Sequence, residues 1–314
     1  MTQQTGGRET VNVHISHLAS GMTLSTPIHI IRGNTSGPIV GISAVIHGDE
    51  IVGVQVLREL WSKLDVAQLS GEIWMLPLGN PLAFEALSRN TPLDMLDMNR
   101  QFPGSPDGWL SEQMAFHITE AFLKKIDYYI DIHAGGSFPI VDYVYLLNHE
   151  GLSRSFLSEL LYKPAALYPA TTAGVTIARG VPTCVLELGG GYPKQDEYVA
   201  RGVANIRNML RVCGSLAGEV ETRPKQTLLH EIKVMRPRNG GLCYPAQPLP
   251  PGTRLKAGTR LAEIVSATSF QVLETMDTPF EDNVVVLSRS DVTRVNPGDY
   301  TFMIGNLATA QELD

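Results

Sequence analysis

The chain has 314 residues, of which 43% are hydrophobic and 18% are charged, and its formal net charge is −7. This composition excludes a disordered or fibrous protein, and a chain of about 300 residues can bury a full core without disulfides. An acidic chain without a long basic run is a poor candidate for binding nucleic acid or an anionic membrane. Three widely spaced cysteines, with no Cys-x-x-Cys motif, argue against a disulfide framework and suit a reducing compartment.

Membrane insertion and secretion are not expected from the sequence. No stretch of about 20 apolar residues is present, so no segment is expected to span a bilayer. The first 22 residues lack the positively charged segment followed by an apolar segment that is typical of a signal peptide. The predicted location is therefore the cytoplasm.

Strand-like and helix-like stretches alternate from about residue 28 to residue 214. The expected strands span residues 38–46, 72–78, 128–132, 141–147 and 181–188. The expected helices span residues 50–64, 111–126 (with Ser111 as N-cap) and 194–213. Continuous apolar strands that alternate with amphipathic helices predict an α/β domain with helices on both faces of a sheet.

The pattern changes after about residue 223, where Pro and Gly become frequent and helical periodicity disappears. Residues 253–264 and 293–304 form a weak internal repeat, each copy with a turn at a glycine, Gly258 or Gly298. Such self-similarity predicts two related halves of a small β unit. The sequence therefore predicts a catalytic α/β domain of residues 1–222 and a smaller all-β domain of residues 223–314. A single domain with an all-β extension is the alternative.

The first candidate for chemistry is His47-Gly-Asp-Glu50, which joins the first of these strands to the first of these helices. Open α/β sheets bind ligands at the carboxyl ends of their strands. An imidazole nitrogen and a carboxylate oxygen three residues apart across this turn can converge on one cation. The alternative is a loop histidine and an acid placed in the first helical turn because the helix dipole favours it there.

The second candidate is Asp131-Ile-His133, at the end of another expected strand. Alternation along the strand places Asp131 and His133 on the same face. A carboxylate commonly orients the second ring N–H of a histidine ligand, so Asp131 is a candidate for supporting the site. Together with His47 and Glu50, His133 completes the ligand set of a hydrolytic zinc site. The alternative is a polar pair at a strand end.

The third candidate is Glu187, near the end of a mostly apolar strand and just before three consecutive glycines. A carboxylate in such a strand is costly unless it is paired or used. Beside a metal-activated water it could accept a proton and later deliver it to a leaving amine. The alternative is a glutamate exposed at the strand terminus.

The fourth candidate is the polar pair Asn99-Arg100, with Arg89 upstream. The planar fork of an arginine fits a carboxylate through two parallel hydrogen bonds, and Asn99 could add an amide donor. The alternative is a surface loop with an ion pair to Asp94 or Asp97.

The combined order of these residues resembles that of the zinc carboxypeptidase superfamily. The strings AVIHGDE, GNPLAFEALSRN, DMNRQFPG, DIHAGG and VLELGGG are similar to the succinylglutamate desuccinylase/aspartoacylase family. The motifs cover about residues 38–215. The resemblance implies a carboxypeptidase-like mixed sheet with helices on both faces, followed by a β domain, whose repeat resembles a barrel sandwich. No lysine follows Lys256, so a carrier domain loaded at a lysine between the two halves is excluded.

The resemblance also implies roles for individual residues. His47, Glu50 and His133 would hold one zinc ion per chain, and Glu187 would be the general base and acid. Asn99 and Arg100 would bind a substrate carboxylate. Arg89 would polarise the scissile carbonyl or stabilise the oxyanion. Arg179 and Tyr192 are the candidates for a further arginine and tyrosine that some members use.

The predicted function is zinc-dependent hydrolysis of the amide bond of an N-acyl amino acid or a similar small carboxylate-bearing amide. The predicted partner is thus a small molecule rather than nucleic acid or membrane, and a homo-oligomer is left open. One alternative is a metallocarboxypeptidase that acts on short peptides. Another is a non-catalytic small-molecule-binding protein with the same pocket. A nucleotide-binding protein has little support, because no Gly-x-Gly-x-x-Gly follows the first strand and no P-loop is present.

Overall fold

The chain forms two sheets and six α-helices in the residues that its computed structural model describes, which are 6–191, 195–289 and 291–314. The strands before residue 222 are β1 (Gly7–His17), β2 (Thr23–Arg32), β3 (Thr35–Ala44), β4 (Ser70–Leu76), β5 (Tyr128–His133), β6 (Pro139–Tyr145), β7 (Leu160–Tyr162) and β8 (Thr183–Gly190). The helices are α1 (Val52–Lys63), α2 (Pro81–Glu85), α3 (Leu110–Ile118), α4 (Glu150–Arg154), α5 (Thr172–Ala178) and α6 (Asp196–Val212). Short helical turns are η1 (Val66–Gln68), η2 (Met98–Arg100), η3 (Thr119–Leu123) and η4 (Leu307–Thr309).

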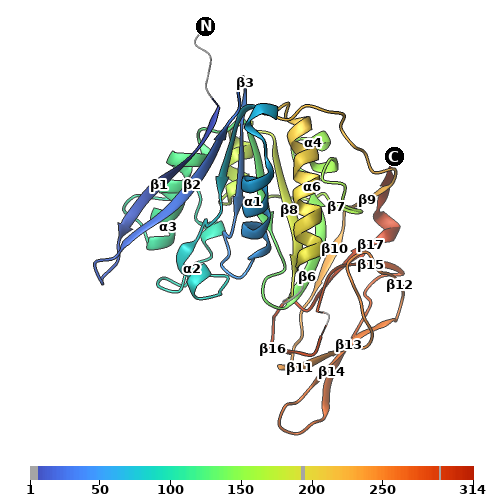
Figure 1. Cartoon of the computed structure of the whole chain (residues 1–314). Helices are drawn as coiled ribbons and strands as arrows, with labels where there is room; N and C mark the ends of the chain where they lie inside the picture. Colours follow the sequence, from blue (N-terminus) through green and yellow to red (C-terminus); the bar gives the residue numbers. More distant parts are fainter. Residues whose placement is uncertain (1–5, 192–194, 290) are drawn as a thin grey trace.

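The later part of the chain is built from strands. They are β9 (Gln226–Leu229), β10 (Ile232–Met235), β11 (Gly241–Pro245), β12 (Arg254–Lys256), β13 (Arg260–Val265), β14 (Val272–Asp277), β15 (Asp282–Arg289), β16 (Thr293–Val295), β17 (Phe302–Asn306) and β18 (Gln311–Leu313). The main sheet has the order β1-β2-β4-β3-β5-β8-β6-β15-β17-β10, and a smaller sheet has the order β14-β13-β11-β16. The main sheet therefore continues without a break from the α/β part into the β-rich part (Figure 1).

Helices cover both faces of the main sheet, so the predicted α/β class is confirmed. The central strands β4, β3, β5 and β8 run parallel to their neighbours in that order. Helices α1 and α6 pack on one face with a core that includes Val56, Leu60 and Ile206, and both lie in front of the sheet in Figure 1. Helix α3 and turn η3 pack on the other face through Met114 and Phe122.

Two strands at the start of the chain lie outside the predicted pattern. Strands β1 and β2 form an antiparallel hairpin that pairs through β2 with β4. Along β1 only Val13 and Ile15 are buried, because β1 is the outer strand of the sheet. Polar residues therefore occupy most of its length, and the continuous apolar run that identifies a central strand is absent from β1.

The predicted N-cap of the third helix is wrong. Helix α3 begins at Leu110, so Ser111 lies inside its first turn. The Ser111 hydroxyl donates to Asp94 Oδ1 at 2.9 Å and lies 2.7 Å from the Thr91 hydroxyl. The Trp109 N–H instead donates to the Glu112 carboxylate at 2.7 Å, so a residue within the helix caps its N-terminus.

The two copies of the internal repeat form matching halves of a β unit, as predicted. The first copy contains β12 and β13, and the second contains β16 and β17, with Gly258 and Gly298 at positive φ of 71° and 88° in the turns. The first copy passes from the main sheet to the smaller sheet, and the second passes back. The two sheets enclose a core that includes Cys243 and Ile304. The domain boundary at residues 222 and 223 stays a prediction.

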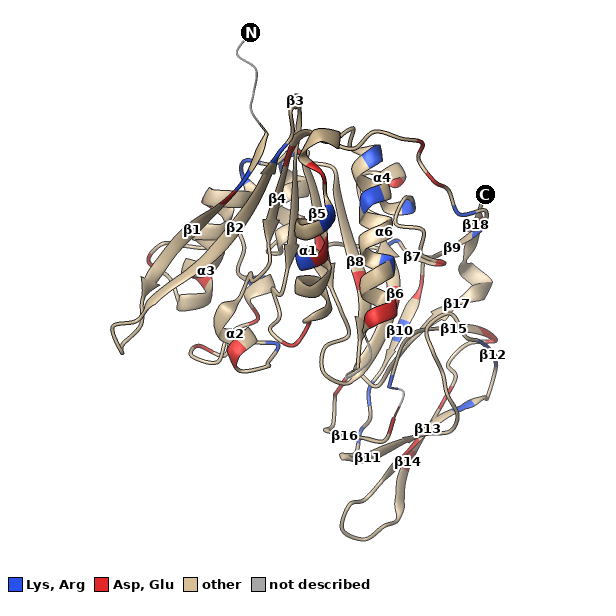
Figure 2. Ribbon diagram, viewed as in Figure 1, with Lys and Arg blue, Asp and Glu red and all other residues tan. Residues whose placement is uncertain are grey.

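Charged positions of both signs are interspersed over the helices and strands (Figure 2). Among the described residues, no helix has the length and apolar character needed to cross a membrane.

Leu60 is fully buried between α1 and the sheet, so it provides a test of this packing. Replacing Leu60 with Ala should lower the free energy of unfolding by about 2–5 kcal/mol, because the change removes buried methyl groups and leaves a cavity. Denaturant unfolding of both proteins measures this loss. The matched control is Arg58→Ala on the exposed side of the same helix, which should change the free energy by less than about 0.5 kcal/mol. Equal losses in the two variants would show that α1 does not pack as described.

Candidate metal centre

The carboxyl ends of three neighbouring strands meet at one edge of the main sheet. His47 follows β3 by three residues, His133 ends β5, and Glu187 lies directly opposite His133 on β8. Because β3, β5 and β8 are parallel, these side chains are brought to the same edge from segments far apart in sequence. This is the edge where open α/β sheets bind their ligands.

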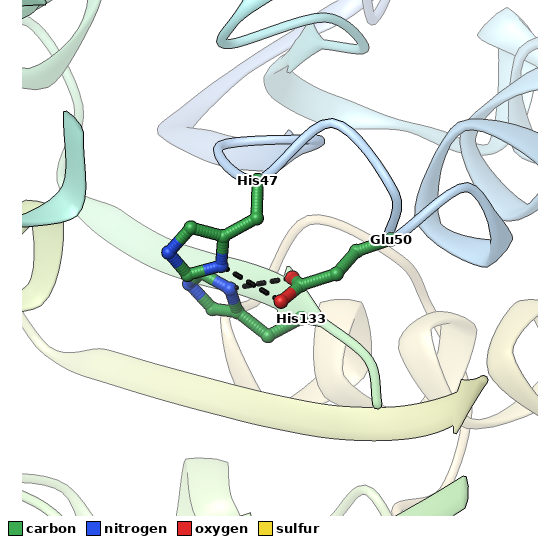
Figure 3. A group of neighbouring side chains, drawn as sticks. All are labelled: His47, Glu50 and His133. Carbon is green, nitrogen blue, oxygen red and sulfur yellow. Dashed lines mark hydrogen bonds and ion pairs between the residues drawn. The ribbon is translucent and has the colours of Figure 1, made fainter. Parts of the chain in front are cut away.

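Glu50 lies between two imidazole rings (Figure 3). Its carboxylate oxygens are 2.7 Å from His47 Nδ1 and 2.8 Å from His133 Nδ1. The two ring centroids are 4.9 Å apart, and one ligand atom from each residue lies within 4.8 Å of the others. All three residues are buried, with 3–5% of their surface exposed. The structure therefore brings together the three predicted ligands.

The donor set fits a divalent cation. Two imidazole nitrogens and one carboxylate oxygen are typical of hydrolytic zinc sites, although they also suit other divalent metals. Each imidazole turns Nδ1 toward Glu50 and Nε2 toward another carboxylate. His47 Nε2 is 3.2 Å from Asp97 Oδ1, and His133 Nε2 is 3.1 Å from Asp131 Oδ2. Such carboxylates fix the tautomer and the orientation of a histidine ligand, which leaves both Nδ1 atoms as the donors.

Asp131 is held in place by hydroxyl groups from both sides. Ser43, its register neighbour on β3, donates to Asp131 Oδ1 at 2.6 Å. Thr172, at the start of α5, donates to Asp131 Oδ2 at 2.5 Å. Asn99 completes this cluster, because its amide nitrogen is 3.2 Å from His133 Nε2 and its oxygen accepts the Thr172 N–H at 3.1 Å. The buried polar groups behind His133 are thus joined in one network.

Asp97 is a site residue that the sequence interpretation did not find. One oxygen contacts His47, and the other accepts a hydrogen bond from Arg89 Nη2 at 2.9 Å. Arg89 Nη1 also lies 3.8 Å from Glu50 Oε1, so the predicted Arg89 does adjoin the ligand group. The sequence offered Asp97 only as an ion-pair partner in a loop. Its contact with His47 spans 50 residues of chain, and no local pattern signals it.

Two further features shape the first ligand loop. A Cβ at Gly48 would lie 1.9 Å from the backbone of Ala83, so only glycine fits there. Asp49 accepts the Ser137 N–H at 3.1 Å and therefore ties this loop to the turn after His133. Asp49 was not among the predicted site residues, because its partner lies 88 residues away.

The buried charges stabilise one another. Burial alone would raise the pKa of Glu50, but His47 and His133 beside it hold that pKa below its ordinary value. Burial opposes the charged form of His133, whereas Asp131 and Glu50 raise its pKa well above the ordinary value. Burial likewise opposes ionisation of Asp97, and the His47 hydrogen bond together with Arg89 lowers its pKa. The carboxylates therefore stay ionised around a position that attracts positive charge.

Glu187 behaves differently from these carboxylates. Burial raises the pKa of Glu187 to about 8, and the negative charges of Glu50 and Asp131 act in the same direction. His133 and Arg89 oppose the shift without cancelling it. A carboxyl group with a pKa near neutrality can both accept and donate a proton, which is the property expected of a general acid and base.

The three candidate ligands line one cavity of about 1080 Å³, together with Asp97, Asp131, Arg89, Asn99 and Glu187. Arg100 also lines it, and its guanidinium lies 4.4 Å from the centre of the Tyr168 ring. Arg179 does not line it, because its guanidinium donates to the carbonyls of Leu123 and Lys124 at the end of η3. Tyr192 lies outside the described residues.

The raised pKa of Glu187 predicts a pH-dependent difference in stability between the metal-free protein and its Glu187→Gln variant. The folded-state pKa is about 8 against an ordinary value of 4.5. Folding therefore favours the protonated form, and stability is lost as the pH rises through this interval. Glutamine cannot ionise, so the variant should gain at least about 2 °C in Tm relative to wild type between pH 5 and pH 9.

Thermal unfolding in the presence of a chelator measures this gain. Glu85→Gln, at an exposed position, is the matched control and should show no such trend. A Tm difference between wild type and Glu187→Gln that stays constant with pH would contradict the buried position of this carboxyl group.

Comparison with known proteins finds similar sequences and folds. The model of the succinylglutamate desuccinylase/aspartoacylase catalytic domain matches residues 36–213, which is more than half of the chain. A similar protein is the N-alpha-acetyl-L-2,4-diaminobutyric acid deacetylase of Halomonas elongata, 28% identical over 206 residues. That match spans 62% of this chain and 60% of the relative, so the chain covers less than two thirds of the relative's length.

Solved structures with the same fold cover almost the whole chain. A succinylglutamate desuccinylase/aspartoacylase from Rhodobacter sphaeroides has a TM-score of 0.82, with 24% identity and coverage of 96% of this chain and 95% of that one. The product-bound ectoine utilization protein EutE (DoeB) from Ruegeria pomeroyi has a TM-score of 0.83, with 21% identity and coverage of 98% and 97%. On the family-model match, the chain belongs to the succinylglutamate desuccinylase/aspartoacylase family.

Proposed function

We propose that the chain is a zinc-dependent deacylase that hydrolyses the amide bond of an N-acyl amino acid or a similar small carboxylate-bearing amide. The observation that carries this proposal is the convergence of His47, Glu50 and His133 beside Glu187 on one cavity. Membership of the family supports the reaction class. The Halomonas elongata relative, named as a deacetylase of an acetylated diamino acid, supports a small acylated amino acid as substrate.

His47 and His133 would hold the metal through their Nδ1 atoms, together with the Glu50 carboxylate. A zinc ion bound there supplies Lewis acidity, which polarises a carbonyl and lowers the pKa of water from about 15.7 toward about 7. Asp97 and Asp131 keep the two imidazoles oriented for this purpose. The protein's own contribution at this point is therefore a rigid, buried set of donors.

Glu187 would move the proton. It accepts a proton from the attacking water as the water oxygen bonds to the acyl carbon, and it delivers that proton to the amine nitrogen as the carbon–nitrogen bond breaks. The products are a carboxylic acid and a free amine. A pKa of about 8 allows Glu187 to serve in both directions near neutral pH.

Two arginines would position the substrate. Arg89, next to Glu50 and with half of its side chain exposed, would stabilise the oxyanion that develops on the acyl carbonyl. Arg100 would bind the substrate carboxylate through its planar guanidinium, which the Tyr168 ring supports from one face. Asn99 stays a proposed second donor to this carboxylate, and its contacts with His133 and Thr172 fix its side chain. The cytoplasmic location stays a prediction from the sequence.

Removal and return of the metal tests the proposal, with N-acetyl and N-succinyl amino acids as substrates and short peptides for comparison. Chelation should abolish hydrolysis and zinc should restore it, with one zinc ion bound per chain by metal analysis. Glu187→Gln should keep the zinc and lower kcat by about 100-fold or more, because it removes general acid–base catalysis.

Each of the other results points to a different function. Near-normal turnover of Glu187→Gln with zinc bound would show that another group is the base. Preference for short peptides would indicate a carboxypeptidase. Zinc binding without hydrolysis of these compounds or of amino acids with longer acyl groups would favour the non-catalytic binding protein.

Arg100→Lys tests how the substrate carboxylate is held. Lysine keeps the charge but cannot form two parallel hydrogen bonds or the flat contact with Tyr168. We expect KM to rise about 10-fold or more with a smaller change in kcat, measured by steady-state kinetics on one N-acyl amino acid. Arg58→Lys, on the exposed side of α1, should leave both constants unchanged. An unchanged KM for Arg100→Lys would remove Arg100 from the carboxylate site.

A further inference from the structure

The cavity continues past Glu187 over the part of the main sheet that the chain's second half completes. Beyond Glu187 its wall includes six apolar or aromatic side chains, which we term the apolar strip: Val141, Tyr143, Tyr145, Val234, Leu287 and Met303. Strands β6, β15, β17 and β10 supply these residues in that order across the sheet. The metal group occupies only one end of the cavity.

Strand registers make the strip continuous with the catalytic group. Tyr143 lies directly opposite Glu187, and Val141 lies opposite Leu287. Leu287 in turn lies opposite Met303, and Met303 lies opposite Val234. A row of side chains on one sheet face thus leads from the proposed general base to the outer strand β10.

Tyrosines form the part of this wall nearest to Glu187. The rings of Tyr143 and Tyr145 are 5.2 Å apart, and the Tyr143 hydroxyl donates to the Tyr145 hydroxyl at 3.1 Å. Tyr162 packs on Tyr145 at 5.6 Å. Burial raises the pKa of Tyr145 well above its ordinary value, so this wall is uncharged at neutral pH. Aromatic rings of this kind favour apolar and aromatic guests.

Charged side chains on this side of the cavity already have partners. Arg289 donates to the Tyr300 carbonyl at 3.1 Å and lies 3.9 Å from Asp299. Arg236 stacks on the Tyr300 ring at 4.1 Å. These residues line the same side of the cavity as the strip, and the carbonyls of Tyr300 and Gly298 occupy part of their donor capacity. The strip itself contains no charged side chain.

The order of groups along the sheet assigns a direction to the substrate. The proposed metal ligands lie at the ends of β3 and β5, and Asn99, which contacts His133, is followed directly by Arg100 in turn η2. Glu187 lies on β8, and the apolar strip lies on the strands beyond β8. In an N-acyl amino acid the carboxylate and the acyl group lie on opposite sides of the scissile bond. With the carboxylate at Arg100 and the scissile bond at Glu187, the acyl group extends over the strip.

We propose that the apolar strip is an acyl-binding subsite, and that the preferred substrates carry a medium-length aliphatic or an aromatic acyl group in place of acetyl or succinyl. The inference rests on the proposed deacylase function. The size of the cavity supports it, because about 1080 Å³ slightly exceeds the range of about 300–1,000 Å³ seen for pockets that hold drug-sized ligands. Burial of apolar surface supplies the binding free energy.

The test uses one amino acid with four acyl groups: acetyl-, succinyl-, hexanoyl- and phenylacetyl-L-alanine. Affinity is measured by calorimetry on the zinc-loaded Glu187→Gln variant, and kcat/KM is measured on wild type. We expect hexanoyl- and phenylacetyl-alanine to bind at least about 10-fold more tightly than acetyl-alanine, which corresponds to about 1.4 kcal/mol or more. The same order is expected in kcat/KM.

Val234→Asp, added to the Glu187→Gln background, tests the strip itself. Val234 is half-buried on the outer strand β10, so a charge there should remove the hexanoyl preference by weakening hexanoyl-alanine binding far more than acetyl-alanine binding. Lys233→Asp is the matched control, because it places the same charge one residue away on the exposed face and should keep the preference. If Val234→Asp fails to fold, the acyl series on the parent protein still decides the question.

The outcomes separate the two proposals. Equal or tighter binding of acetyl- or succinyl-alanine overturns the acyl-binding subsite, and hydrolysis of those compounds by wild type would leave the deacylase function intact. Tighter hexanoyl binding without hydrolysis of any compound by wild type overturns the deacylase function and retains the subsite. A hexanoyl preference that survives Val234→Asp places the acyl group elsewhere and also overturns the subsite.

Discussion

The carboxylate of Glu50, buried between two imidazoles, is the interaction on which the site depends. A charge removed from water is costly unless it is paired and hydrogen-bonded. Glu50 meets this condition through His47 and His133, and each histidine meets it through a further carboxylate, Asp97 or Asp131. The group is therefore stable only as a unit in which negative charge surrounds a cation. This physical requirement accounts for the concentration of acids in an otherwise apolar sheet edge.

The parallel sheet brings these charged groups close enough to pair. Strands β3, β5 and β8 deliver their carboxyl ends to one edge, and register alone sets Glu187 opposite His133. The loop between β3 and α1 then needs to turn tightly, and Gly48 permits its close approach to the backbone at Ala83. The positions of the reactive groups thus follow from backbone hydrogen bonding before any side chain interacts with another.

Sequence patterns predicted the parts of the site that depend on local order. A histidine or a glutamate at the end of an apolar strand can be recognised in the sequence alone, and this pattern predicted His47, His133 and Glu187 as site residues. Asp97 and Asp49 escaped prediction because their partners lie 50 and 88 residues away. Helix α3 shows the same limit on a smaller scale, since Glu112 rather than the expected Ser111 satisfies its first N–H group. Local spacing predicts element type well, but it does not choose between competing polar partners.

On the proposed function, the main sheet also separates chemistry from selectivity. The groups that would perform hydrolysis follow β3 or lie on β5 and β8, whereas the wall beyond Glu187 comes from β6 and from strands of the second half of the chain. Leu287 and Met303 can therefore change without moving a metal ligand, because backbone pairing rather than side-chain packing holds the two regions in register. Arg289 reinforces this arrangement, since it binds the 293–300 turn and lies 5.6 Å from the Phe138 ring of the first half. On the proposed function, changes in these distant strands would alter the acyl preference while the reactive edge stays in place.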